Sequence, residues 1–154
     1  MLWELYEQHP HVVAAECHLL LFLQMACEKL CKAHLIPAGA PPEAFQSGHA
    51  YIANPPPMVI KQQLLHLGRD LAGLKRVQTI VRHIAVEIEA LNPSVRRNRG
   101  RPDNCGYPWE YGGQVISPLR WSFVPLRLLE APAGRTFLKL LRGAIDRILN
   151  ELER

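Results

Sequence analysis

Apolar residues recur at helical spacing near the start of the chain, over residues 12–35. A repeat of three to four residues predicts a single long helix here. Its apolar positions are Val13, Leu20, Leu23, Cys27, Leu30, Cys31 and His34. The polar residues Glu16, Gln24, Glu28 and Lys32 occupy another face of the same helix. We expect removal of the Lys32 side chain to have little effect on stability.

Proline and glycine divide the middle of the chain into two further helical segments. Pro37, Gly39, Pro41 and Pro42 end the first helix, because proline cannot continue a helical hydrogen-bond ladder. A second helix is predicted to begin near Pro57 and to cover residues 58–66. Helical periodicity returns over residues 71–91 and ends at Asn92-Pro93.

The last third of the chain predicts a long loop followed by one helix. Residues 92–118 are rich in proline and glycine and show no sustained period, so they are predicted to be irregular. A short extended or turn-like piece follows around Trp121, Phe123 and Pro125. Ala133-Gly134-Arg135 then opens a final amphipathic helix over residues 136–152. The pattern predicts an all-α bundle of four to five helices, in a single domain over residues 1–154.

Composition is that of an ordinary globular domain. The chain has 154 residues, of which 48% are hydrophobic and 21% are charged, so one hydrophobic core is expected. The net charge of +4 is compatible with a polyanionic partner such as RNA. The longest apolar run, residues 19–23, is too short to span a bilayer, and the start of the chain has no basic segment. We therefore expect a cytoplasmic protein without membrane contact.

The four cysteines favour core positions over a disulfide framework or a metal site. Cys27, Cys31 and His34 share one face of the first helix, and two thiolates with an imidazole can bind zinc. Cys17 and His18 lie two or more turns away, so a fourth ligand is missing from this helix. The stripe also coincides with the apolar face, which favours packing in the core. No metal and no cofactor are expected.

Several short motifs occur in a characteristic order along the chain. They are Glu28-Lys29 and Lys32-Ala33 on the first helix, Ser47-Gly48-His49 after it, Tyr107-Pro108-Trp109 in the long loop, and Gly134-Arg135 at the last helix. In this order they resemble the HEPN (higher eukaryotes and prokaryotes nucleotide-binding) superfamily. The resemblance implies a small helical bundle that is often a dimer. Some members cut RNA, and others pair with a nucleotidyltransferase.

One arginine and histidine pair has the spacing of the ribonuclease signature of that superfamily. Arg76 and His83 are separated by six residues, so they lie on the same side of a helix after nearly two turns. In RNA-cleaving members the resemblance assigns acid–base chemistry to the histidine and stabilisation of phosphate charge to the arginine. An ordinary solvated helix face is the alternative interpretation and the one we favour. At another family position, where an arginine precedes a Tyr-Pro segment, this chain has Gly106.

The long loop holds the best candidates for ligand binding. Arg96, Arg97, Arg99 and Arg101 fall within six residues, and guanidinium groups bind phosphates in a bidentate manner. Tyr107 and Trp109 follow and are able to stack on bases beside those arginines. The alternatives are a solvated basic loop and aromatic side chains that anchor the loop to the bundle, and for the aromatic residues we favour anchoring.

Two functions from different classes follow from these observations. The preferred one is a non-catalytic or weakly catalytic HEPN-like module that binds a nucleotide, RNA or a partner protein, such as a nucleotidyltransferase. The alternative is a metal-independent HEPN-type ribonuclease of a toxin–antitoxin or defence system. A homodimer is expected in both cases, because residues 19–23 are apolar around much of the helix circumference.

Overall fold

The protein is a mostly helical bundle with one small β-hairpin. The computed structural model describes residues 15–36, 55–66, 71–92 and 104–152, together with residues 39, 68 and 95. Five α-helices and a two-stranded sheet lie in this part of the chain, and they confirm the predicted all-α class. The helices are α2 (Glu16–Leu35), α4 (Pro55–His66), α5 (Leu71–Glu89), α6 (Val124–Glu130) and α7 (Pro132–Leu152).

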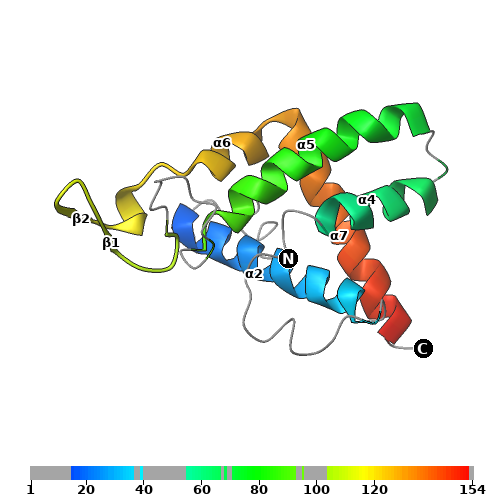
Figure 1. The fold of residues 1–154 in the computed structure, drawn as a ribbon, viewed down its shortest axis with the longest axis horizontal. Coiled ribbons are helices and arrows are strands. Elements are labelled where there is room, and N and C mark those ends of the chain that lie inside the picture. The colour runs from blue at the N-terminus through cyan, green and yellow to red at the C-terminus, as the bar shows by residue number, and fades with distance from the viewer. Residues whose placement is uncertain are drawn as a thin grey trace.

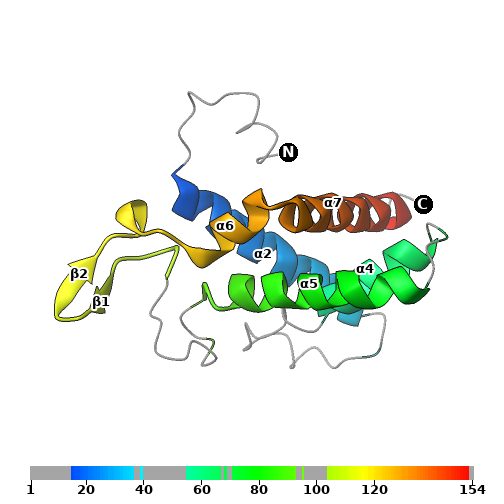
Figure 2. The same ribbon diagram turned by 90° about the horizontal axis from the view of Figure 1, so that it is seen from above.

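The helices pack around one hydrophobic core. α4 and α5 lie side by side, and α7 packs against both of them and against α6 (Figure 1). α2 contacts α4, α5 and α6, and it runs between α5 and α7 when the bundle is seen from above (Figure 2). Large, fully buried side chains from all of these helices fill the centre; they include Leu20, Ile60, Ile84, Ile88, Leu91, Phe123, Leu129 and Phe137.

The predicted helices are present, but two of them have different starting points. α2 begins at Glu16 with Ala15 in an extended conformation before it, so the helix is shorter than predicted at this end. Residues 12–14 lie outside the described part. α7 begins at Pro132, four residues before the predicted start. Proline fits the first turn of a helix, where a backbone N–H has no intrahelical partner.

The prediction of an irregular segment over residues 92–118 was wrong for its second half. Strands β1 (Trp109–Tyr111) and β2 (Gln114–Ile116) form an antiparallel hairpin there. Gly112 and Gly113 join them with φ angles of 61° and 75°. Two consecutive residues with positive φ make the two-residue turn that matches the twist of a hairpin, and glycine adopts this conformation without steric cost.

The chain returns from the hairpin to the bundle through a short helical connection. A 3₁₀ turn, η1 (Pro118–Arg120), and extended residues 121–123 lead into α6. The predicted extended piece therefore ends before Pro125, which lies in the first turn of α6. α6 and α7 approach closely at Gly134, where an added Cβ would overlap the carbonyl oxygen of Leu128 and the backbone of Leu129.

Candidate functional site

The segment that precedes the hairpin is turned by the side chain of Asn104. This side chain is buried, and its Oδ1 accepts hydrogen bonds from the backbone N–H groups of Gly106 at 2.9 Å and Tyr107 at 3.2 Å. An asparagine that bonds the backbone two and three residues ahead imposes a local turn. Cys105, the next residue, is buried as well. The turn holds the backbone at Tyr107 in a defined place at the base of the hairpin.

The two aromatic residues predicted to bind a ligand have different environments. The Trp109 ring packs edge-on against Trp121, with centroids 5.4 Å apart and an interplanar angle of 83°, and it lies 6.4 Å from the Phe123 ring. Trp109 is half-buried against the core, as the loop-anchoring interpretation predicts. Tyr107 is 72% exposed. Of this pair, only Tyr107 has a ring that is free to meet a ligand.

The hairpin extends away from the helices as an arm, and both views show it projecting beyond the bundle (Figures 1 and 2). One side of β1 faces Trp121, which also contacts the ring of Tyr111 at a centroid distance of 6.0 Å. Val115, on the other side of the sheet, is almost fully exposed. Since an isolated two-stranded hairpin is marginally stable, the aromatic contacts at its base are what hold the arm in place.

Most of the predicted basic residues lie outside the part of the chain that the structure describes. Arg96, Arg97, Arg99 and Arg101 lie outside the described residues, and so does His49. Arg76 is part of the α5 backbone, but its side chain is not described. His83 is exposed on the outer side of α5. It lines neither of the two cavities found among the described residues.

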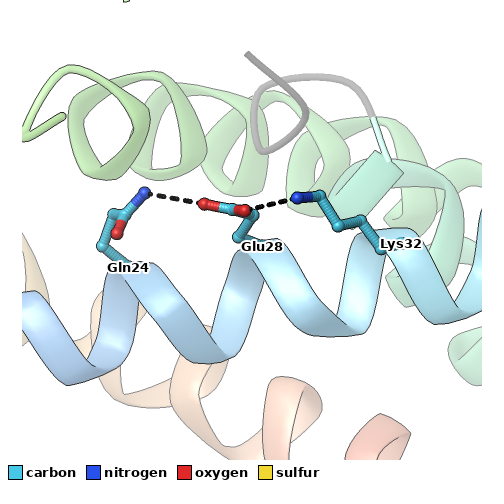
Figure 3. Close-up of polar contacts among 3 residues, drawn as sticks. All are labelled: Gln24, Glu28 and Lys32. Atoms are coloured by element: carbon cyan, nitrogen blue, oxygen red, sulfur yellow. Dashed lines mark hydrogen bonds and ion pairs between the residues drawn. The ribbon is translucent and has the colours of Figure 1, made fainter. Parts of the chain in front are cut away.

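The polar stripe of α2 faces the bundle, which the sequence pattern did not predict. Gln24 and Glu28 are buried, and the Lys32 side chain is only 17% exposed. The three side chains follow one another along α2 (Figure 3). Gln24 Nε2 donates to Glu28 Oε2 at 3.4 Å, and Lys32 Nζ lies 2.6 Å from Glu28 Oε1. Removing one partner of a buried ion pair strongly destabilises the fold, because the remaining buried charge then has no opposite charge beside it. The expectation that Lys32 contributes little to stability is therefore revised.

The thiols of α2 are core groups. Cys27 and Cys31 are fully buried, as the core interpretation predicts. Burial raises the pKa of the Cys27 thiol to about 12. Burial also raises the pKa of Cys31, and the nearby Cys27, Glu89 and Glu28 add to this shift. Both thiols are protonated at neutral pH, and a protonated thiol is neither a nucleophile nor a good metal ligand. No cluster of metal-binding side chains occurs among the described residues.

The outer side of α2 exposes two large apolar side chains beside the charged Lys29. Phe22 is 48% exposed and Met25 is 45% exposed, although both lie in the middle of the helix. Next to them an open groove of about 260 Å³ separates α2 from α7. The groove is lined by Ala26, Lys29, Leu30, Ala33, Ile145, Ile148 and Leu149. We call Phe22, Met25 and these groove residues the α2–α7 surface.

The second cavity has no polar side chain suited to catalysis. It measures about 150 Å³ and lies between α5 and α7. Its lining is Val77, Ile80, Val81, Ala133, Thr136, Phe137 and Leu140, of which only threonine is polar. The Thr136 hydroxyl donates to the carbonyl oxygen of Pro132 at 2.9 Å, so its hydrogen is already used within the helix.

The exposed face of α5 carries two basic residues that the sequence reasoning did not select, Lys75 and Arg82. They are exposed, and so is the neighbouring His83, which the sequence reasoning did select. A signal for this face exists in the sequence, since residues 71–86 contain no aspartate or glutamate. Met25 and Leu149 were also missed, because apolar residues at helical spacing are normally assigned to the core.

None of the helices in the described part is long and apolar enough to cross a membrane. Comparison of the chain with protein-family models, with curated protein sequences and with solved structures found no match. The α2–α7 surface and the exposed ring of Tyr107 are the features of the described part that are suited to binding.

Proposed function

We propose that this protein is a HEPN-like binding module, non-catalytic or weakly catalytic, which forms a homodimer through the α2–α7 surface and binds RNA. The observation that carries the proposal is the exposure of Phe22, Met25 and Leu149 around an apolar groove. The small cavities of the described part offer apolar contact area rather than groups for acid–base chemistry. Such surfaces are typical of a protein that works by association.

The size of the α2–α7 surface supports a contact with another protein chain. Phe22, Met25 and Leu149 each leave about half of their surface in water. Together they expose an apolar area on the order of 300 Å², which is in the range of the largest apolar patch on a typical monomer, and such a patch is often functional. A second copy of the chain is the occupant we propose, in keeping with the dimers that the HEPN resemblance implies. A nucleotidyltransferase-type protein is the competing occupant.

Light scattering of the wild-type protein and two variants tests the dimer. We expect the wild type to have twice the chain mass of 17.5 kDa at micromolar concentration. Phe22→Glu combined with Met25→Glu should give the mass of one chain with a nearly unchanged melting temperature, because both side chains are half-exposed. Met58→Glu is the control, since Met58 is 62% exposed on α4, away from this surface. A wild-type protein with the mass of one chain contradicts the proposed dimer.

The proposed RNA contacts are Tyr107 and the loop arginines Arg96, Arg97, Arg99 and Arg101. The support for Tyr107 is its exposed ring on a backbone that Asn104 fixes, because a prepositioned ring stacks on a base at low entropic cost. Tyr107→Ala should weaken binding of a short RNA about tenfold without a change in the melting temperature. Trp109→Ala should lower the melting temperature, because that ring anchors the arm. If the wild type and Tyr107→Ala bind the RNA with equal affinity, Tyr107 is not an RNA contact.

A metal-independent ribonuclease of a toxin–antitoxin or defence system is the second candidate function. Its support is the exposure of His83 on the same helix as Arg76. His83→Ala separates the two functions, since a ribonuclease should lose cleavage and keep RNA binding. If the wild-type protein does not cleave RNA under any metal-free condition, the ribonuclease function is contradicted and the binding module remains.

A further inference from the structure

The outer face of α5 is a row of positively charged and neutral polar groups. Lys75, Thr79 and Arg82 are exposed and follow each other at intervals of four and three residues, so they lie along one side of the helix. His83 is exposed next to Arg82. Lys75 and Arg82 are about 10 Å apart along the helix axis at 1.5 Å per residue.

Lys75 and Arg82 have no ion-pair partner among the described residues, and the first acidic residue of α5, Glu87, comes one turn after His83. α7 is different. There Arg142 pairs with Asp146 at 3.6 Å, and Arg147 pairs with Glu151 at 4.0 Å. A row of unpaired cations attracts phosphates, whereas a row of ion pairs has little net field.

The side chains on this face also indicate how a polyanion would be held. No large hydrophobic or aromatic side chain is exposed on the described part of α5. The Thr79 hydroxyl donates to the Lys75 carbonyl oxygen at 3.0 Å, so its hydrogen is not available for a ligand. The donors that remain are the Lys75 ammonium and the Arg82 guanidinium, which suit phosphate oxygens. Stacking on bases and reading of base edges have no support here.

We propose that the outer face of α5 binds the phosphate backbone of RNA, independently of sequence, through Lys75 and Arg82. This inference rests on the proposed RNA-binding function and names a contact surface in addition to Tyr107 and the loop arginines. The α5 face supplies charge, and Tyr107 supplies base stacking. The two surfaces therefore differ in how their contributions depend on salt.

Fluorescence anisotropy with a short mixed-sequence RNA tests the α5 face. Lys75→Gln combined with Arg82→Gln should weaken binding at low salt about tenfold and should reduce the slope of log K against log salt by about 1.4, since each lost phosphate contact removes about 0.7 for a single strand. Arg127→Gln combined with Lys139→Gln is the matched control. It also removes two exposed positive charges, from α6 and α7, and it should change affinity less than threefold.

The possible outcomes separate this inference from the proposed function. An equal loss of affinity in both double variants would mean that only net charge matters, and it would overturn the α5 face. Unchanged binding by the α5 variant, with a loss on replacing Arg96, Arg97, Arg99 and Arg101 by serine, would overturn the α5 face and leave the proposed function standing. Failure of the wild-type protein to bind RNA at low salt would overturn both. Melting temperatures within a few degrees of wild type would show that the variants are folded.

Discussion

α2 departs from the usual arrangement of a surface helix on both of its sides, although most of the residues it buries are apolar. Its inner side carries Gln24, Glu28 and Lys32 against the bundle, and its outer side presents Phe22 and Met25 to solvent. Most helices at a protein surface bury their apolar side chains and expose their charges. Gln24, Glu28 and Lys32 are paired with each other, while the exposed Phe22 and Met25 have no described cover.

The difference shows that the two sides are under different physical demands. The inner side must satisfy every polar group it buries, and the Glu28 carboxylate meets this demand by accepting from Gln24 and pairing with Lys32. Such a network adds less stability than apolar packing does, but it disfavours packing arrangements in which the charges are left alone. The outer side of α2 does not bury polar groups of this kind within one chain. We propose that its exposed apolar side chains meet a second copy of the chain.

The largest effect should come from removing the buried carboxylate. Glu28→Ala leaves the Lys32 ammonium and the Gln24 amide without their acceptor in a mostly buried site, so we expect the free energy of unfolding to fall by about 3 kcal/mol. Chemical denaturation of the variant and of the wild type measures this change. Glu16→Ala is the control on the same helix, because Glu16 is exposed and its loss should have almost no effect. If Glu28→Ala and the wild type were equally stable, the site around Glu28 would be accessible to water and the buried ion pair would be contradicted.

A smaller loss is expected when the cation of the pair is removed. Lys32→Ala leaves Glu28 with its bond to Gln24, and the lysine head group is partly exposed, so the cost should be about 1 to 2 kcal/mol. Denaturation of the Glu28→Ala, Lys32→Ala and double variants gives the coupling between the two residues. Additive effects would mean that the 2.6 Å contact contributes nothing specific to stability.

The smallest effect should be a pH dependence at the inner edge of α2. Burial lowers the pKa of His34, and Arg147 on α7 lowers it further. The unfolded state then binds a proton more readily than the native state, so stability should decrease as the pH falls through about 6.5. His34→Gln cannot take up this proton and should lose less stability on acidification. Thermal melts of both proteins at neutral and acidic pH make the comparison, and identical pH profiles would contradict it.

The fold was predictable where a helix has one apolar side. α5 and α7 bury a regular apolar stripe, and their positions follow from periodicity to within a few residues. The hairpin was missed because its strands have only three residues each and little burial. Gly112-Gly113 between Trp-Glu-Tyr and Gln-Val-Ile was the available signal, since paired glycines favour a two-residue hairpin turn.

The candidate sites were less predictable, because burial on α2 depends on tertiary packing. The sequence places Gln24 and Glu28 on a polar face, and nothing in that pattern shows that other helices cover it. Phe22 was among the apolar residues from which a dimer was predicted, but its neighbours Leu19 and Leu20 are buried in the bundle. Only the structure separates the residues that fill the core of one chain from those that remain for a partner.

The central claim is that the outer side of α2 is a contact between copies of the chain, and oxidation of two methionines tests it most directly. Met25 and Met58 are 45% and 62% exposed in the single chain, so peroxide should convert both to the sulfoxide at similar rates when the protein is dilute. At concentrations where the dimer forms, Met25 should become protected while Met58 keeps its rate, as measured by peptide mass spectrometry. A constant ratio of Met25 to Met58 oxidation at every protein concentration would contradict the claim.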